Sequence, residues 1–94
     1  MRISNAQAKH ILLELNDYTV RRGQRVYANL DELAAREPWS IVLDGKKLAS
    51  GTADSQGYAK TSFVIPANAT LGIRTIHAYG KFPDRTDPDR ITIH

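Results

Sequence analysis

The sequence predicts an all-β domain, folded as an antiparallel β-sandwich of about seven strands. Runs in which apolar and polar residues alternate recur along most of the 94-residue chain. That alternation is the pattern of strands with one buried face. Turn signals separate the runs at intervals of roughly eight to twelve residues, a spacing typical of a sandwich or barrel. Residues that favour helix cluster at one place only, 31–36.

The chain begins with a segment that has neither a strand nor a helix pattern. Residues 1–9 lack any apolar period, so we expect an N-terminal arm that becomes ordered only against another molecule. The sandwich domain then spans 10–94. Its first strand is predicted at 10–15, with an inward face formed by Ile11, Leu13 and Leu15.

The next long strand is predicted at 25–30. A short extended piece at 18–20 and a turn at 21–24 lead into it. Alternate side chains of this strand are apolar and are expected to face the core. These are Val26, Ala28 and Leu30.

The segment 31–36 is the one stretch expected to be helical. The aspartate at its start is a suitable N-cap, and Pro38 prevents the helix from continuing, so one or two turns fit. We expect this segment to cross from one sheet to the other. Trp39, Ile41 and Leu43 follow with strand periodicity, which predicts a central strand with these side chains in the core.

Two turn signals mark the middle of the chain. Asp44-Gly45 suits a two-residue hairpin turn, whose backbone requires positive φ. A second polar turn, 54–57, leads into a strand at 58–65, which ends before Pro66 because proline cannot donate to a ladder. The inward face of that strand is predicted to consist of Ala59, Thr61, Phe63 and Ile65.

The stretch 72–79 leaves its inward face open. One face carries Ile76 and Ala78, and the other carries Ile73 and Tyr79. Apolar residues on both faces are typical of a strand that is covered on both sides.

A polar loop is predicted at 82–89, followed by a last strand at 90–94 in an edge or terminal position. The loop contains three aspartates, and calcium binds several carboxylate oxygens. The spacing of a calcium-binding loop is absent and arginines alternate with the acids, so we predict a solvated loop without metal. The acids are Asp84, Asp87 and Asp89.

The order of these segments resembles that of a bacterial immunoglobulin-like domain. The resemblance covers 10–94 and rests on the succession of 18–26, Leu43-Asp44-Gly45, 53–57, 63–67 and 72–80. It implies an immunoglobulin-like form of the sandwich. Domains of this kind act as adhesion modules, spacers or virion decorations, so the resemblance does not specify one function.

The chain departs from that family at two places. The stretch 33–39 replaces a short glycine-proline link, and Arg74 stands where a large apolar residue is common. Trp39 resembles the buried strand-C tryptophan of antibody domains, although the flanking cysteines are missing.

The amino-acid composition limits the kinds of chemistry and partner that the sequence predicts. The chain has no cysteine, so disulfides and thiolate chemistry are excluded. Thirteen Lys/Arg against ten Asp/Glu give a net charge of +3, which is too small and too mixed to predict nucleic-acid binding. No export signal or membrane-length apolar run is present. If Met1 is the native start, the chain stays in the cytoplasm or leaves inside a larger particle.

No residue set predicts an enzyme or a cofactor. Ser40, Asp44 and His77 are the ingredients of a hydrolase triad, but no Gly-x-Ser-x-Gly elbow accompanies them. We interpret them as ordinary strand residues. The three histidines lie too far apart to predict a metal site.

The residues predicted to contact a partner come from the arm, from a basic turn and from one strand aromatic. The basic side chains suit an acidic protein partner. A surplus of apolar residues leaves two interpretations open, scattered exposed aliphatics and a contact patch. The predicted contact residues are Arg2, Ile3, Lys9, Arg21, Arg22, Arg25 and Tyr79.

These observations predict a non-enzymatic structural or binding module. We expect a phage virion protein, either a capsid decoration or a tail surface module, assembled in the host cytoplasm. Its partner would be a capsid or tail protein, and copies could associate on the particle; neither membrane nor cofactor is expected. The alternative is an excised spacer or adhesion module of a bacterial surface or secreted protein.

Overall fold

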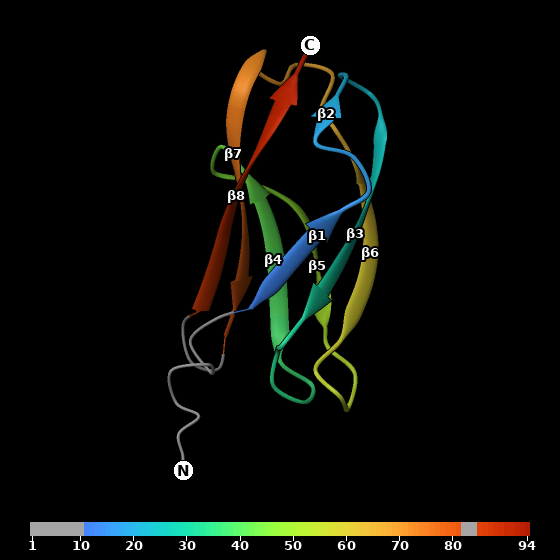
Figure 1. The fold of residues 1–94 in the computed structure, drawn as a ribbon, viewed down its shortest axis with the longest axis vertical. Coiled ribbons are helices and arrows are strands. Elements are labelled where there is room, and N and C mark those ends of the chain that lie inside the picture. Colours follow the sequence, from blue (N-terminus) through green and yellow to red (C-terminus); the bar gives the residue numbers. More distant parts are fainter. Residues whose placement is uncertain (1–10, 82–84) are drawn as a thin grey trace.

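The computed structural model describes residues 11–81 and 85–94. Eight strands form two sheets, and no helix occurs within these ranges. The strands are β1 (Leu12–Leu15), β2 (Thr19–Val20), β3 (Arg25–Asp31), β4 (Pro38–Leu43), β5 (Lys46–Thr52), β6 (Ala59–Val64), β7 (Gly72–Gly80) and β8 (Arg85–Ile93). They run roughly along one long axis (Figure 1).

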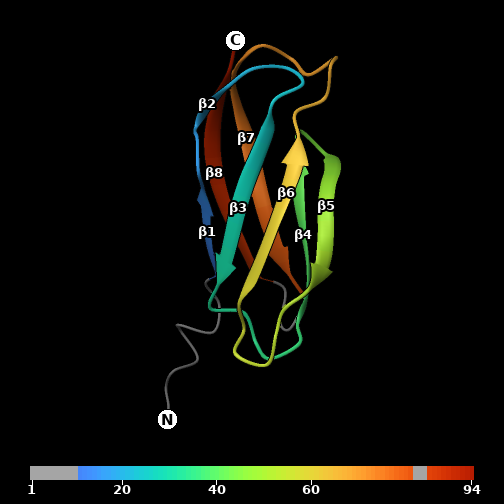
Figure 2. The same cartoon turned by 90° about the vertical axis from the view of Figure 1, so that its right-hand side faces the viewer.

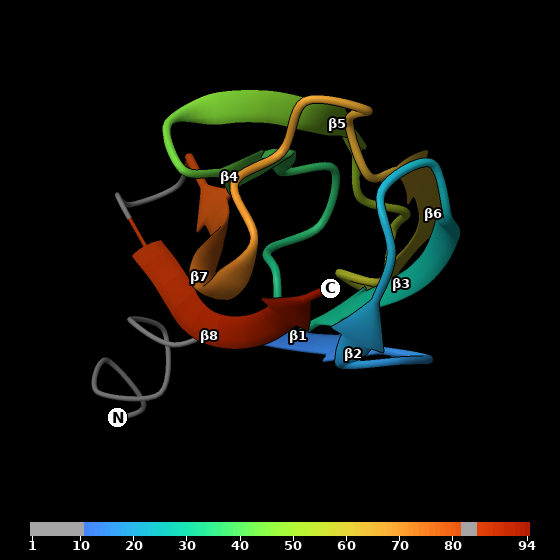
Figure 3. The same cartoon turned by 90° about the horizontal axis from the view of Figure 1, so that it is seen from above.

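The two sheets face each other across one core (Figures 2 and 3). The smaller sheet has the order β1-β3-β6, and the larger has the order β2-β8-β7-β4-β5. All neighbours are antiparallel except β2, which runs parallel to β8. The predicted all-β sandwich is confirmed at this level. It has eight strands rather than about seven.

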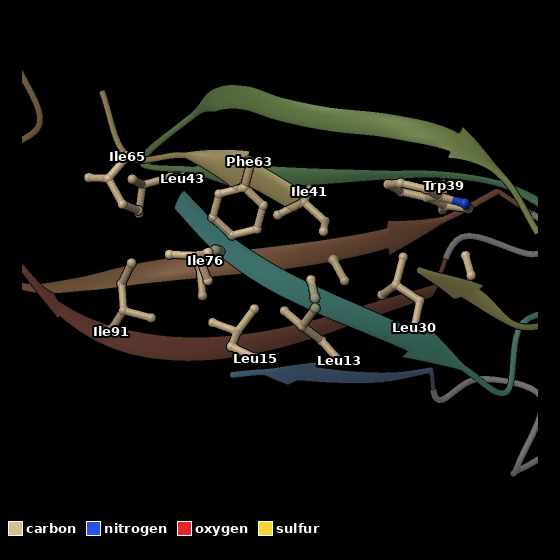
Figure 4. Packing of buried hydrophobic residues seen from close by; sticks show 14 of the residues in the cluster. Leu13, Leu15, Leu30, Trp39, Ile41, Leu43, Phe63, Ile65, Ile76 and Ile91 are labelled. Atoms are coloured by element: carbon tan, nitrogen blue, oxygen red, sulfur yellow. The ribbon is translucent and has the colours of Figure 1, made fainter. Parts of the chain in front are cut away.

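The core contains the apolar side chains that the alternation predicted. Leu13, Leu30 and Phe63 reach it from the smaller sheet, and Ile41 and Ile76 reach it from the larger one (Figure 4). The inward faces of 10–15, 25–30 and 39–43 are confirmed by burial of every apolar residue predicted there. Period-two burial on both sheets therefore positions the outward side chains considered below.

The Asp44-Gly45 hairpin is confirmed. Both turn residues have positive φ, 49° for Asp44 and 82° for Gly45. Positive φ at both positions is what a type I′ turn requires, and its twist matches that of the flanking strands. The turn joins β4 directly to β5.

The predicted helix at 31–36 is wrong, although the segment does cross between the sheets. Glu32 and Arg36 have positive φ, 62° and 60°, which is incompatible with a right-handed helix. The backbone N–H groups of Leu33 and Arg36 donate to carbonyls of the 54–57 turn, at 3.1 and 3.0 Å. Pairing with that turn replaces the hydrogen bonds that a helix would make within itself.

Buried side chains fix the crossover in this shape. Leu33 lies in the core, and Glu37 is fully buried. The Glu37 carboxylate accepts a hydrogen bond from the Ala34 N–H at 2.7 Å. Asp31 does not cap a helix, since its side chain accepts from the N–H of Glu32 at 2.7 Å.

The predicted loop 82–89 is wrong in its second half, because β8 already begins at Arg85. Pairing with β7 extends from Arg85 opposite Gly80 to Ile93 opposite Gly72. Pro88 is tolerated because β2 pairs with β8 only near its end, so the proline has no ladder partner on that side. In the strand order β8 lies between β2 and β7, but β2 pairs only with Thr92 and Ile93. The rest of β8 has β7 alone as its described partner, as in an edge strand.

The structure of β7 shows which face of 72–79 points into the core. Ile76 and Ala78 are fully buried, whereas Ile73 is 68% exposed and Tyr79 is 40% exposed. The described residues cover this strand on one face only. Within those residues the apolar groups of the other face lie on the surface.

Candidate binding surfaces

The outer surface of the five-stranded sheet, here called the five-stranded face, gathers outward side chains from four strands. The register places Tyr79 of β7 between Ser40 of β4 and Thr86 of β8. The next outward row along the strands places His77 between Val42 and Pro88. Ile73 lies on the same side of β7, further toward the other end.

An aromatic pair gives this face a defined shape. The rings of His77 and Tyr79 stack with centroids 5.4 Å apart and an interplanar angle of 23°. Neighbours two apart on a strand point to the same side, so both stacked rings lie on the outer side of β7. Val42 beside it is half-buried, and together these groups form an apolar and aromatic centre.

The charges on the five-stranded face are of one sign. The described residues at outward positions of β4, β5, β7 and β8 include Lys47 and Arg90 and no carboxylate. A hollow of about 530 Å³ lies at one end of the face, between β5 and the end of β7. Lys47 and Lys81 flank it, and Tyr79 forms part of its wall.

The outer surface of the smaller sheet differs in charge. It presents Glu14 together with Arg25 and Lys60, so acids and bases are mixed. Tyr27 is 57% exposed there and lies beside Ser62 of β6. Leu12 and Val64 are also exposed on this surface, at 41% and 42%. Scattered exposed apolar groups among charges of both signs are normal for a protein surface.

The predicted contact residues do not converge. Arg22 and Arg25 are held by the fold: Arg22 Nε donates to the Ala69 carbonyl and Arg25 Nη1 donates to Ser62 Oγ, both at 2.8 Å. Arg21 lines a separate hollow of about 450 Å³. This turn adjoins the start of β7, whereas Tyr79 lies near its other end.

Three of the predicted contact residues cannot be placed. Arg2, Ile3 and Lys9 lie outside the described residues, as does the arm 1–9. Among the predicted residues that the structure describes, Tyr79 alone lies on the five-stranded face.

The triad ingredients are not assembled. Asp44 Oδ2 accepts from Arg74 Nε at 2.7 Å, and no hydrogen bond joins Ser40, Asp44 and His77 within the described ranges. This hydrogen bond to Asp44 raises the pKa of Arg74 above its ordinary value. It also explains the arginine at an inward position of β7, because near the strand end its side chain stays 33% exposed beside the turn.

The described part of the chain contains no cluster of acids and histidines suited to a metal ion. Of the three loop aspartates, Asp84 lies outside the described residues. Asp87 Oδ2 accepts from the Leu13 N–H of β1 at 2.8 Å. No helix in the described ranges is long and apolar enough to cross a membrane.

Sequence reasoning missed a groove between the two sheets. It has a volume of about 510 Å³ and lies where β5 and β6 end their respective sheets. Trp39 and Gly51 line it. A glycine inside a strand often marks a close approach by another group, but no strand was predicted at Gly51, which only the observed β5 contains.

No family model and no curated protein matches the chain. Solved structures do. The crystal structure of CHIR-AB1 matches with a TM-score of 0.59 and 20% identity, over 90% of this chain and 98% of that one. At this identity the similarity shows the fold alone.

Two further matches are parts of longer proteins. A carbohydrate acetylesterase from Xanthomonas citri matches with a TM-score of 0.58 and 15% identity, over 87% of this chain and 19% of that one. Spo0M, a sporulation control protein from Bacillus subtilis, matches with a TM-score of 0.57 and 13% identity, over 90% of this chain and 49% of that one. Both matches again show the fold alone.

Proposed function

We propose that the chain is a non-enzymatic, bacterial immunoglobulin-like module that docks on a protein of a larger assembly through the five-stranded face. The strand order supports the immunoglobulin-like assignment. One sheet of that fold contains the first, second, fourth and fifth strands, and the other contains the third, sixth and seventh. β1, β3 and β6 correspond to the first, second and fifth, and β4, β7 and β8 to the third, sixth and seventh. β2 and β5 are additional strands of the larger sheet, and the smaller sheet has no counterpart of the fourth strand among the described residues.

The observation that carries the docking proposal is the outward side of β7. Ile73, His77 and Tyr79 all lie on that side of β7, and Ile73 and Tyr79 are exposed to solvent. Apolar and aromatic groups with a polar rim are typical of the centre of a protein–protein interface.

Charge complementarity defines the partner. The five-stranded face carries lysine and arginine without a carboxylate among its described outward residues. The partner is therefore a protein with an acidic surface and an apolar spot opposite Tyr79. A capsid or tail protein of a phage particle is the partner we propose, as the sequence led us to expect. Its binding weakens as salt concentration rises, because exposed charges are screened over about 10 Å at 0.1 M.

Site-specific photo-crosslinking tests the proposal. A photoreactive phenylalanine analogue replaces Tyr79 in one variant and Tyr27 in a matched control, since both tyrosines are exposed and lie on opposite sheets. Each variant is mixed with purified phage particles and with the cell-envelope fraction of the organism that encodes the chain. We expect position 79 to cross-link to a particle protein and position 27 not to.

The other outcomes are equally informative. Cross-linking from position 79 to an envelope protein alone would favour the surface spacer or adhesion role over the virion role. Equal cross-linking from both positions, or none from position 79, would contradict docking through the five-stranded face.

A further inference from the structure

The groove between β5 and β6 lies between two free strand edges. β5 is the last strand of the larger sheet and β6 the last strand of the smaller one, and they lie side by side (Figure 2). The groove of about 510 Å³ between them is lined by Thr52 of β5 and Thr61 of β6. A free edge presents a row of main-chain N–H and C=O groups that can pair with another strand.

A buried polar group at this groove lacks a partner. Trp39 is only 7% exposed, and its indole Nε1 makes no hydrogen bond within the described part of the chain. Buried N–H groups in native proteins are nearly always satisfied. An acceptor oxygen from a bound molecule would satisfy this one.

Gly51 leaves room for the indole. A Cβ atom at Gly51 would lie 2.7 Å from Trp39 Cζ2 and 3.1 Å from Cε2, the carbon bonded to Nε1. The six-membered ring of the indole therefore lies against the one residue of β5 that has no side chain, with Nε1 bonded to one of the contacting carbons. Figure 4 shows the indole nitrogen at the tip of the side chain, directed away from the other labelled core residues.

The rim carries one charge of each sign. Lys60 lines the groove, with its Nζ 5.9 Å from the centre of the Tyr58 ring. Asp54 also lines it, and its Oδ1 accepts from the backbone N–H groups of Gln56 and Tyr58, which holds this carboxylate against its own turn. Lys60 is therefore the charged group at the groove that can pair with an acidic group on the bound molecule.

We propose that this groove binds an extended peptide of a protein partner, which adds as a strand at the free edge of β5. An oxygen of the peptide accepts from Trp39 Nε1, and an acidic residue of the peptide lies near Lys60. Main-chain pairing of this kind is a recurring mode of peptide recognition. The groove adjoins the hollow at the end of the five-stranded face, with which it shares Trp39, Ser50, Gly51 and Thr52. It lies on the β6 side of β5, away from Tyr79, and does not depend on the docking proposed there.

The single tryptophan makes the test direct, because the chain has one indole N–H signal. A random hexapeptide library is selected on the intact chain, and the enriched peptides are synthesised and titrated into ¹⁵N-labelled protein. We expect a downfield shift of the indole proton and the largest amide shifts in β5 and β6. In an added strand, every second backbone N–H of the peptide faces β5. Methylating one alternate set of backbone nitrogens should therefore abolish binding, and methylating the other set should not.

Variants identify the contacts. Trp39→Phe keeps an aromatic side chain in the core and removes the donor, and should weaken the selected peptides at least about five- to tenfold, the effect of one hydrogen bond. Thr61→Gln narrows the groove and should weaken them further. Thr19→Gln is the matched control, since Thr19 is exposed on β2 at the opposite edge of the larger sheet, and this variant should bind normally.

Three results would overturn the proposal: no peptide enriched, enriched peptides that leave the indole signal unmoved, or binding that survives methylation of either set of nitrogens. None of these results bears on cross-linking from position 79. Failure of this site and failure of the five-stranded face are therefore distinguishable.

Discussion

Trp39 requires a glycine opposite it in β5, because the indole occupies the space that a side chain at Gly51 would need. Gly51 does not have positive φ, so its backbone would accept any residue. The constraint comes from packing alone. A glycine inside a strand costs about 0.5–1 kcal/mol, and at this position that cost makes room for the largest side chain of the core.

Gly51→Ala should therefore destabilise the protein by about 1–3 kcal/mol, the usual cost of overpacking a core. Urea unfolding followed by tryptophan fluorescence measures this change. Ser50→Ala is the control, because Ser50 points outward beside Ser40 and should change stability by less than about 0.5 kcal/mol. Equal stability of both variants would show that the indole can move away from Gly51 at no cost.

The crossover 31–37 owes its shape to tertiary contacts that override its helix propensity. Arg36 adopts positive φ, 60°, while its N–H donates to the Asp54 carbonyl at 3.0 Å. A left-handed conformation costs a residue with a side chain roughly 1–2 kcal/mol. Glycine avoids that cost but loses about 0.5–1 kcal/mol of chain entropy on folding.

Arg36→Gly should therefore raise the free energy of unfolding by about 0.5–1 kcal/mol, the difference between these two costs. Arg36→Val should lower it by more than about 1 kcal/mol, since a β-branched residue is poorly tolerated at positive φ. Thermal and urea unfolding of both variants measure these changes in the free energy of unfolding. The opposite order of stability would mean that the crossover is held in another conformation.

Strands could be predicted from the sequence because burial in a sheet has a period of two, which the residues themselves display. The inward sets around Leu13, Ile41 and Phe63 followed directly. The shape of 31–37 could not, since it depends on carbonyls of a turn some twenty residues later. For the same reason β8 was predicted too short: pairing with β7 recruits a polar, proline-containing stretch that has no strand pattern of its own.

The candidate surfaces were less predictable than the core. Tyr79 could be named as a contact residue, but its companions on the five-stranded face depend on which residues β4 and β8 place beside it. The groove at Trp39 depends on two strand edges that meet only after both sheets have formed. Such juxtapositions are set by register and topology rather than by local pattern.

The two sheets are joined by the N-terminal segment as well as by the core. The chain pairs first with β3 in the smaller sheet and then, as β2, with β8 in the larger one. A second link lies beside this switch, where the Leu13 N–H of β1 donates across the sheets to Asp87 Oδ2 of β8 at 2.8 Å. The contact occupies a main-chain donor at the edge of the smaller sheet.

Asp87→Ala should therefore leave the Leu13 N–H without a partner and lower stability by about 1–3 kcal/mol, the cost of an unsatisfied, partly buried donor. Asp87→Asn should retain most of the stability, because its amide oxygen can still accept that hydrogen bond. Asp89→Ala is the control, since within 11–81 and 85–94 the Asp89 Oδ1 accepts only from the N–H of the next residue. Hydrogen exchange supplies the decisive reading: the amide of Leu13 should lose protection in Asp87→Ala and keep it in Asp87→Asn. Loss in both variants would mean that the carboxylate charge, rather than the acceptor oxygen, holds the sheets together at this edge.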